Sequence, residues 1–526
     1  MRHDTIRFRL CAAVAMGALG YATVIPLWTR PAQAEVPLPA ALMPAPQYAP
    51  SPGSAPQPGV APGTPGAQAP LDNGADPPAR VGRLADFSGA VSYHSASATE
   101  WVPATVNYPV TSGDSFWTQP GASARIEISN TAVTMAPATE IDVSTLDNQQ
   151  LQAAEPQGEV YVQVGALAPG ETYQLATPRG TVTIATPGQY GIAAGDTDTP
   201  TTVTVIAGQA AIAGPGLSMS VGPGQEASIT GTDQFAGTIG SATPDAFLGQ
   251  MLAATAPPPP PAAVAPVVAQ MTGAQDLGNY GSWDSTPQYG QVWYPNVAPG
   301  WVPYREGHWA YVQPWGWTWV DNDPWGFAPF HYGRWVQVGP RWGWVPGEPV
   351  APGYGGYGYV APPPVYAPAL VAFIGIGVGV AVTAALLSSH SVGWVPLGWR
   401  EPYRPWYHAS PTYIRNVNIR NVNVTRITNI TTINRNVTIN NFANRQAATV
   451  VPAAAMLTSR PVGPAVQHVT PAMLASARPV VGRQPLPPSR ATVGITPQNA
   501  ARLGAVAAPP GAPVRPAVAP GPAIRP

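Results

Sequence analysis

The sequence predicts an all-β protein of two modules, joined and flanked by disordered Pro/Ala-rich segments. Apolar and polar residues alternate between residues 81 and 232, as expected for strands with one buried face. A tryptophan-rich motif repeats between residues 276 and 410. The 68 prolines and 54 glycines among 526 residues also argue against one continuous globule.

Residues 1–34 have the pattern of a secretory signal peptide. Basic residues, an apolar run and a small-x-small cleavage pattern follow one another: Arg2, Arg7, Arg9, Leu10–Ile25 and Ala32-Gln33-Ala34. We therefore expect an exported protein of the periplasm or cell envelope; the alternative is an uncleaved membrane anchor. Residues 35–79 are Pro-rich and nearly uncharged, which predicts a disordered linker.

The sequence lacks residues that several classes of enzyme need for catalysis. All 25 basic residues are arginine, which excludes P-loop, Schiff-base and Ser-x-x-Lys chemistry. The one cysteine, Cys11, lies in the signal peptide, so the mature chain has no disulfide, thiolate metal site or cysteine nucleophile. The sequence contains neither G-x-S-x-G nor H-E-x-x-H. We therefore expect a non-enzymatic protein with no cofactor and no metal.

Charge is distributed unevenly along the chain. Between Val81 and Asp245 there are 15 acidic residues and three arginines, whereas 13 arginines and no acid follow Glu401. Residues 451–526 are rich in Pro, Ala and Val with isolated arginines, which predicts a disordered basic tail. This tail is suited to anionic lipopolysaccharide or phospholipid head groups, or to the acidic module of the same chain.

Residues 80–245 are predicted to form a β-sandwich or short solenoid, because alternating runs such as Val160, Val162 and Val164 are separated by Gly- and Pro-containing turns. The segment contains five motifs that resemble those of the FecR domain and follow in the same order: Gly113-Asp114, Ala122–Ile128, Thr177-Pro178-Arg179-Gly180, Val205–Ala210 and Gly222–Gln225. The resemblance implies an envelope-located β-domain. Only nine residues precede the apolar run of the leader, so we do not expect the family's cytoplasmic contact with a sigma factor.

A Pro/Ala-rich linker at residues 246–275 leads into the tryptophan-rich module at 276–410. Eleven of the 17 tryptophans lie between Trp283 and Trp344, and Gly-Trp-Val-Pro begins at Gly300, Gly343 and Gly393. We expect tandem β-hairpins with aromatic rings paired across strands. Four segments resemble an uncharacterised domain family that occurs beside FecR-like domains: Trp317–Asp321, Pro324–Trp335, Val365–Val371 and Gly393–Gly398. The resemblance gives a domain identity but no activity.

Two segments further along have more than one interpretation. Residues 369–387 are uncharged and long enough for a membrane helix. We favour a buried strand or glycine-rich connection, because a crossing would separate the third Gly-Trp-Val-Pro motif from the other two. Asparagine alternates with Val and Ile around Asn416–Val424, so residues 411–450 are expected to form strands that close the module or self-associate.

Two constellations are candidates for function. Asp321, Asp323, His308 and His331 are near enough in sequence for a metal or acid–base site, although an Asp-Asn-Asp-Pro turn that binds backbone amides explains the aspartates more simply. The second candidate is an exposed aromatic platform for sugar rings, with the alternative that its tryptophans form the core: Trp309, Trp317, Trp325, His331, Tyr332, Arg334 and Trp335.

Taken together, these features predict a non-enzymatic envelope protein that binds an anionic polysaccharide, lipopolysaccharide or another envelope component, or acts as a scaffold. The alternative is a FecR-like sensory or regulatory partner of an envelope signalling system. Nucleic acid is not an expected partner of an exported chain.

Overall fold

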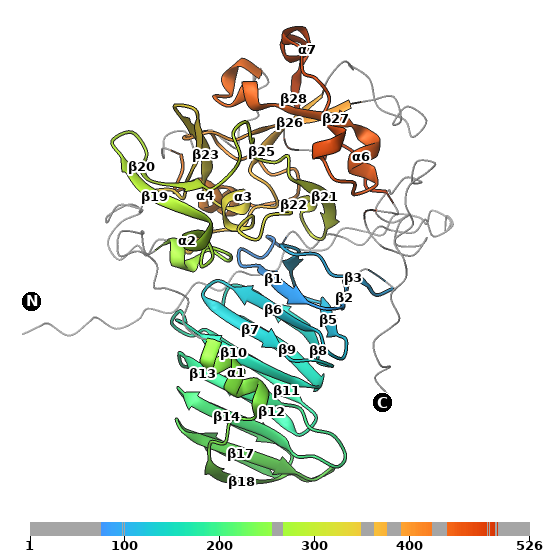
Figure 1. Cartoon of the computed structure of the whole chain (residues 1–526), viewed down its shortest axis with the longest axis vertical. Helices are drawn as coiled ribbons and strands as arrows, with labels where there is room; N and C mark the ends of the chain where they lie inside the picture. The colour runs from blue at the N-terminus through green and yellow to red at the C-terminus, as the bar shows by residue number, and fades with distance from the viewer. Residues whose placement is uncertain are drawn as a thin grey trace, which may run out of the picture. The chain divides into compact units, whose positions relative to one another are not determined.

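Two nine-stranded sheets form a β-sandwich from residues 82 to 241 of the computed structural model (Figure 1). The first sheet has this strand order: β18 (Ala236–Ser241), β17 (Gln225–Thr230), β14 (Thr201–Ala207), β13 (Gly188–Ala193), β10 (Glu159–Val164), β7 (Thr131–Met135), β6 (Ser123–Ile128), β1 (Gly82–Ser88) and β4 (Pro109–Val110). The second has this order: β16 (Leu217–Val221), β15 (Ala210–Gly214), β12 (Gly180–Ile184), β11 (Thr172–Thr177), β9 (Gln150–Gln157), β8 (Glu140–Leu146), β5 (Ser115–Thr118), β2 (Val91–His94) and β3 (Val102–Pro103).

The structure describes residues 75–96, 98, 100–254, 267–348, 362–375, 391–422, 439–480, 482, 484–489 and 492. The predicted signal peptide, most of the 35–79 linker and residues 376–387 of the apolar run lie outside this set. Residues 423–438 and 493–526 of the predicted strands and tail also lie outside it. No helix among the described residues has the length and apolar character needed to span a membrane.

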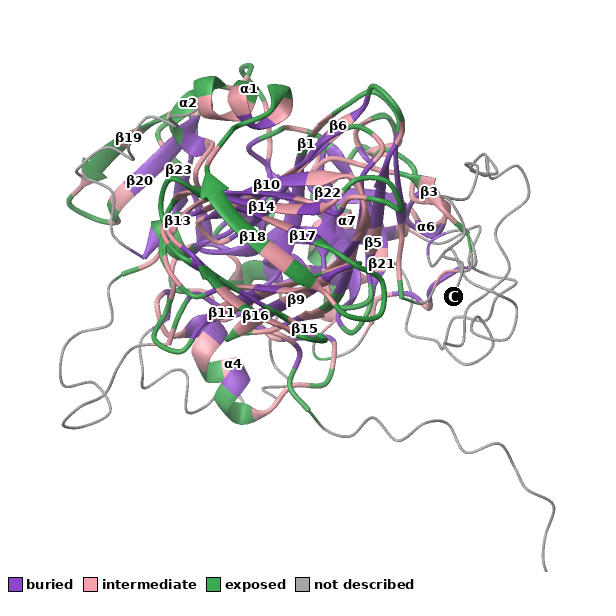
Figure 2. Cartoon of the chain, turned by 90° about the horizontal axis from the view of Figure 1, so that it is seen from below, coloured by how far each residue is buried: buried purple, intermediate pink, exposed green. Residues whose placement is uncertain are grey.

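The sandwich follows from the alternation in the sequence. The chain crosses between the two sheets after nearly every hairpin, so each hairpin contributes one apolar face to a shared core. Val160, Val162 and Val164 of β10 are all buried, and so are Val182 and Ile184 of β12. Strand β18 is an exposed edge, coloured green in Figure 2. The predicted all-β fold is confirmed.

The tryptophan-rich module contains three smaller sheets. Their strand orders are β19 (Gly281–Thr286), β20 (Gly290–Pro295), β24 (Arg341–Val345) and β23 (Arg334–Val338); β21 (Gly307–Val312) and β22 (Gly316–Asp321); and β27 (Thr449–Pro452), β26 (Ser391–Pro396), β25 (Val371–Gly375) and β28 (Arg478–Val480). The expected hairpins are present as β21–β22 and β23–β24. They belong to different sheets, however, and do not stack in tandem.

Short helices complete this module. They are η1 (Val268–Gln270), α2 (Leu277–Tyr280), α3 (Ala328–His331), α4 (Pro411–Asn418), η3 (Ile439–Asn441), η4 (Arg445–Ala447), α6 (Ala453–Leu457), η5 (Gly463–Ala465) and α7 (Pro471–Ser476). A further helix, α1 (Ala246–Ala254), follows the sandwich. Its Leu248 packs on Gly191, where a Cβ atom would lie 2.8 Å from Leu248 Cδ2, so this part of the predicted linker is folded against β13.

Two predictions for the C-terminal third were wrong in the described residues. Residues 411–418 form helix α4 instead of a strand, because Ser410 caps the helix and Tyr413 and Val417 place an apolar face on the core. Residues 449–480 form strands and helices instead of a disordered tail. Val450 and Val451 of β27 are fully buried and pair with β26, which contains the third Gly-Trp-Val-Pro motif.

A buried polar network joins the sandwich to the tryptophan-rich module. Arg83, which is inaccessible to solvent, donates from Nε to Glu127 Oε2 at 2.8 Å and forms an ion pair with Asp276. It also donates from Nη1 to the Pro324 carbonyl at 2.6 Å. Asn107 donates from Nδ2 to the carbonyl oxygen of Asp321 at 3.1 Å. The two modules therefore share hydrogen bonds that are sheltered from water.

Candidate functional site: an arginine-lined pocket

The seven predicted site residues are all buried, in the core of the tryptophan-rich module: Trp309, Trp317, Trp325, His331, Tyr332, Arg334 and Trp335. Trp309, at the centre of this core, has its ring centroid 5.5 Å from Trp319, 5.3 Å from Trp394 and 5.0 Å from Phe373. Trp309 and Trp319 face each other across the β21–β22 hairpin. The rings therefore stabilise the hairpins as the cross-strand pattern predicted.

An exposed aromatic platform is consequently not present at these residues. This module is poor in buried leucine and isoleucine, so its tryptophans supply the apolar area that a core needs. The indole nitrogens confirm the structural role. Trp317 Nε1 donates to the Leu486 carbonyl at 2.8 Å, and Trp344 Nε1 donates to the Tyr332 carbonyl at 2.8 Å.

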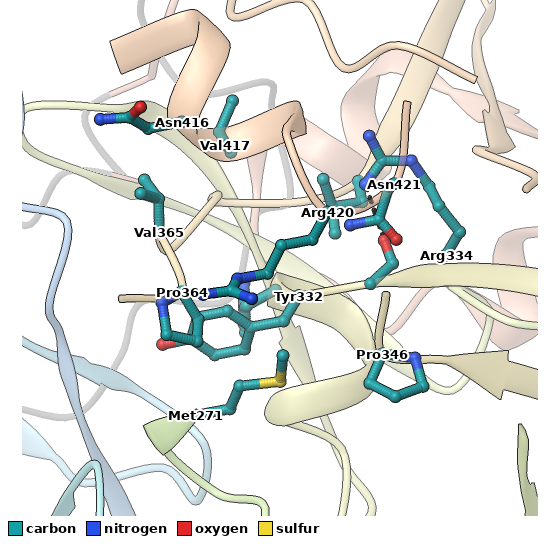
Figure 3. A pocket seen from close by; sticks show the side chains of 13 residues that line it. Met271, Tyr332, Arg334, Pro346, Pro364, Val365, Asn416, Val417, Arg420 and Asn421 are labelled. Carbon is teal, nitrogen blue, oxygen red and sulfur yellow. Dashed lines mark hydrogen bonds between the residues drawn. The ribbon is translucent and has the colours of Figure 1, made fainter. Parts of the chain in front are cut away.

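Three of the seven residues line a small pocket beside this core. We call it the arginine pocket, and its walls come from the start of β23, the residues before β25 and helix α4 with the turn that follows: Met271, His331, Tyr332, Gly333, Arg334, Pro346, Pro364, Val365, Leu370, Asn416, Val417, Arg420 and Asn421. Figure 3 shows Arg420 reaching toward Tyr332 and Pro364, with Arg334 and Asn421 together on the other side.

Arg334 is a buried cation whose hydrogen-bond acceptors are all neutral. Its Nε donates to the Glu401 carbonyl at 2.9 Å, Nη1 to the Gly333 carbonyl at 2.7 Å and Nη2 to Asn418 Oδ1 at 2.9 Å. In the part of the chain that the structure describes, Arg334 forms no ion pair. Burial lowers the pKa of Arg334 to about 10, although the Glu401 charge raises it. The guanidinium therefore stays charged at neutral pH.

The Glu401 carboxylate, whose charge raises the pKa of Arg334, forms its hydrogen bonds with backbone amides and not with the guanidinium. It accepts hydrogen bonds from Gly398 N at 2.7 Å and Ala443 N at 2.6 Å. Burial raises the pKa of Glu401, although the hydrogen bonds from Ala443 and Gly398 and the charge of Arg334 lower it. Two arginines and no acidic residue line the pocket, so its lining is positively charged and suits an anionic ligand.

Helix α4 and the turn after it supply the polar pocket residues that the sequence did not predict. Asn416 belongs to α4, and Arg420 and Asn421 belong to the turn after it; all three line the pocket. Arg420 donates from Nη2 to the Pro362 carbonyl at 2.7 Å and adds a second guanidinium. The signal that would have found this helix is Ser410-Pro411, an N-cap residue followed by proline at the first helical position. The Ser410 hydroxyl accepts from Tyr413 N at 3.1 Å.

Two buried acceptors among the lining residues have no partner within the described chain: His331 Nε2 and Asn421 Oδ1. His331 Nδ1 lies 2.8 Å from the Ala367 carbonyl, so this nitrogen carries the proton and Nε2 is an acceptor. Burial lowers the pKa of His331 to about 3, so the ring is neutral at physiological pH. A ligand with hydroxyl groups has the donors that such acceptors need.

Asp321 and Asp323 form the predicted turn. Asp321 Oδ1 accepts from Asp323 N at 3.0 Å, and Asp321 Oδ2 accepts from Trp319 Nε1 at 2.9 Å. His331 is engaged with Ala367 instead. No group of three or more His, Cys, Asp or Glu side chains with metal-binding geometry occurs among the residues that the structure covers.

Residues 274–401 match the model of a family of unknown function (DUF6600). This confirms the predicted resemblance of the tryptophan-rich module to an uncharacterised domain family. The DUF6600 region contains Tyr332 and Arg334, whereas α4 with Arg420 lies beyond its end. No curated protein matches the sequence.

Two crystal structures of a candidate anti-sigma factor from Parabacteroides distasonis match at 16% identity, with TM-scores of 0.22 and 0.21. The match covers 24% of this chain, and the chain spans 60% of that protein. A likeness at this level carries no argument about function. The FecR resemblance and the regulatory alternative therefore stay predictions.

Proposed function

We propose that this chain is a non-catalytic, exported cell-envelope protein that binds an acidic polysaccharide in the arginine pocket. The observation that carries the proposal is Arg334, a fully buried guanidinium with three neutral acceptors in the wall of the arginine pocket.

The positive charge of the two arginines in the pocket favours an acidic ligand. Burying a cation is costly, and a bound carboxylate would offset more of that cost than the Glu401 charge alone does. Arg420 on the facing wall adds a second planar guanidinium, a group that forms two parallel hydrogen bonds with a carboxylate. A neutral ligand would offer neither guanidinium such a charge-assisted contact.

The other residues that line the arginine pocket favour a sugar as the ligand. Asn421 Oδ1 and His331 Nε2 are acceptors suited to hydroxyl groups, and Asn416 offers a further amide. Met271, Pro364 and Val365 provide apolar surface for the carbon–hydrogen face of a ring. A polyhydroxylated acid fits both kinds of wall better than a simple anion or a purely apolar ligand.

The other parts of the chain fit an envelope location. The signal-peptide pattern at residues 1–34 supports export. Acidic polysaccharides occur at cell surfaces, where an exported chain would meet them. In this proposal the sandwich and the tryptophan core hold the pocket walls in place and perform no chemistry.

Equilibrium binding of the purified full chain to oligogalacturonate and to a neutral galactan of equal length tests the proposal. We expect the acidic oligomer to bind at least about tenfold more tightly, since the two differ by the carboxylates that the arginines would contact. Binding of the acidic oligomer should also weaken with added salt. Equal affinity for both oligomers, or no binding of either, would overturn the proposal.

A further inference from the structure

One face of the β21–β22 hairpin carries two aromatic pairs. Trp309 and Trp319 form the inner pair, at the centre of the core, and Tyr311 and Trp317 form the outer pair, with ring centroids 5.6 Å apart. Alternate residues of a strand share a face, so the four rings make one row that runs toward the hairpin turn. Trp317 at the outer end is nevertheless inaccessible to solvent, which means that another part of the chain covers it.

The covering part is Gln484–Ser489, which has the sequence Gln-Pro-Leu-Pro-Pro-Ser and which we call the proline segment. Trp317 Nε1 donates a hydrogen bond to the Leu486 carbonyl at 2.8 Å. The Gln484 side chain lies against Gly316, where a Cβ atom would be 2.1 Å from Gln484 Nε2. The proline segment is therefore fitted closely to the turn of the hairpin and accepts a hydrogen bond from the indole.

Two further contacts hold the proline segment to the module. The Leu486 side chain is buried and belongs to the same hydrophobic core as Trp317. Ser489 is also buried, and its Oγ donates to the carbonyl of Leu457 in α6. The proline segment thus occupies a surface on which Trp317 would otherwise be exposed.

The prolines explain why an irregular segment can cover these rings. Three of the six residues, Pro485, Pro487 and Pro488, have no N–H, so they bring no amide donor that burial would leave unsatisfied. Proline-rich chains also favour the extended polyproline II helix, and domains that recognise them use grooves lined by aromatic rings. Here Tyr311 and Trp317 supply the rings, and the indole N–H supplies a donor to a backbone carbonyl.

We propose that Tyr311 and Trp317 form a docking surface for a proline-rich segment of a partner protein, and that the proline segment of this chain occupies it as a tethered competitor. A segment joined to the same chain competes at an effective concentration of about millimolar, so a partner in solution has to displace it. The occupant defines the partner's chemistry: prolines on both sides of one apolar residue whose carbonyl accepts from Trp317. Neither ring lines the arginine pocket, so this surface is independent of the proposed sugar site.

Fluorescence anisotropy of a labelled Gln-Pro-Leu-Pro-Pro-Ser peptide tests the proposal on the full chain. Leu486→Asp removes the buried apolar side chain of the proline segment, so it should free the surface and raise peptide affinity at least about tenfold over the unsubstituted chain. The control peptide Gln-Ala-Leu-Ala-Ala-Ser should bind Leu486→Asp at least about tenfold more weakly. Equal affinity for the two peptides would overturn the proposal, and so would an affinity that Leu486→Asp leaves unchanged.

A milder pair of substitutions gives the same test without a change in the core. Ser489→Ala removes the hydroxyl that anchors the proline segment to α6 and should tighten peptide binding about threefold. Thr458→Val removes a hydroxyl that donates to another carbonyl of α6, that of Ala454 at 2.7 Å, and should leave peptide binding unchanged. Equal effects of the two substitutions would contradict the tether.

The indole donor is tested with Trp317→Phe and Trp309→Phe, each added to Ser489→Ala. Trp317→Phe keeps a ring but removes the donor, so it should weaken peptide binding at least about fivefold. Trp309→Phe changes an indole that has no acceptor among the described residues, and peptide binding should stay the same. Equal losses in folded proteins would show that affinity depends on the core and not on the docking surface.

Sedimentation of the full chain distinguishes a partner protein from a second copy of this chain. We expect one sedimentation coefficient at all protein concentrations. A concentration-dependent dimer that the peptide dissociates would show that two copies exchange their proline segments, and this would overturn the assignment to a partner.

Discussion

Asn418 Oδ1 accepts a hydrogen bond from Arg334 Nη2 at 2.9 Å, so the side chain that faces this buried guanidinium is an amide and not a carboxylate. Asn418 also accepts from Tyr403 N at 2.7 Å and donates from Nδ2 to the carbonyls of Tyr403 and Ile414. The amide thus fixes α4 beside β23 and gives Arg334 a neutral acceptor in place of an ion-pair partner.

Asn418→Asp should weaken the binding of oligogalacturonate at least about tenfold, because an internal carboxylate would neutralise Arg334 before any ligand arrives. The substitution also removes two donated hydrogen bonds, so the free energy of unfolding should fall by about 1–3 kcal/mol. Calorimetry and denaturant unfolding measure the two effects. An unchanged affinity in the folded variant would show that the charge of Arg334 plays no part in binding.

Arg83→Leu should lower the free energy of unfolding by about 3–5 kcal/mol, because it leaves the fully buried Glu127 with Arg125 as its one remaining ion-pair partner among the described residues. The double variant Arg83→Leu/Glu127→Leu should recover part of this loss, since it also removes the buried carboxylate that has lost one of its two cations. Denaturant titrations of the single and double variants give the comparison. A double variant that is less stable than Arg83→Leu would be inconsistent with a buried charge pair.

Trp317→Phe should be more destabilising than Trp309→Phe by about 1 kcal/mol. Both indoles are fully buried, but Trp317 Nε1 donates to the Leu486 carbonyl whereas Trp309 Nε1 has no partner among the described residues. Each substitution removes a similar volume, so the hydrogen bond makes the difference. Thermal or urea unfolding of the two variants measures it, and equal losses would argue against the bond.

Stability of the sandwich should fall as pH rises from about 6.5 to 8.5. Burial raises the pKa of Glu140 to about 7 and that of Glu159 to about 8, both above the ordinary value of 4.5. The folded form therefore retains protons that the unfolded chain has already released, and it loses this advantage as pH passes through the folded pKa values. The melting temperature should decline over this window, and Glu140→Gln/Glu159→Gln should flatten the decline. A melting temperature that rises over the same window would contradict the assignment.

Local patterns predicted the sandwich and the hairpins because both depend on period-two alternation and on turn residues. The same alternation misled at Asn416-Val417-Asn418-Ile419, where an eight-residue helix buries Tyr413 and Val417 with a spacing of four. There the cap at Ser410-Pro411 carried more information than the alternation did.

The side of the sheet that a tryptophan faces cannot be inferred from the sequence when both sides of a hairpin are covered. All six residues of β22 are buried, so Trp317 and Trp319 would be covered on either side of the sheet. The pocket depends on contacts between distant segments: Arg334 meets Asn418 across 84 residues. His331, Tyr332 and Arg334 were found as candidates, but their role as pocket walls needed the fold.

The most direct test of the account is the affinity of Arg420→Gln for oligogalacturonate, compared with that of Arg415→Gln. Both arginines belong to α4 and the turn after it, but Arg420 lines the pocket whereas Arg415 is exposed and does not line it. We predict that Arg420→Gln weakens binding at least about tenfold and that Arg415→Gln changes it less than about twofold. Equal losses in the two variants would show that binding depends on surface charge in general and would contradict an acidic-sugar site in the arginine pocket.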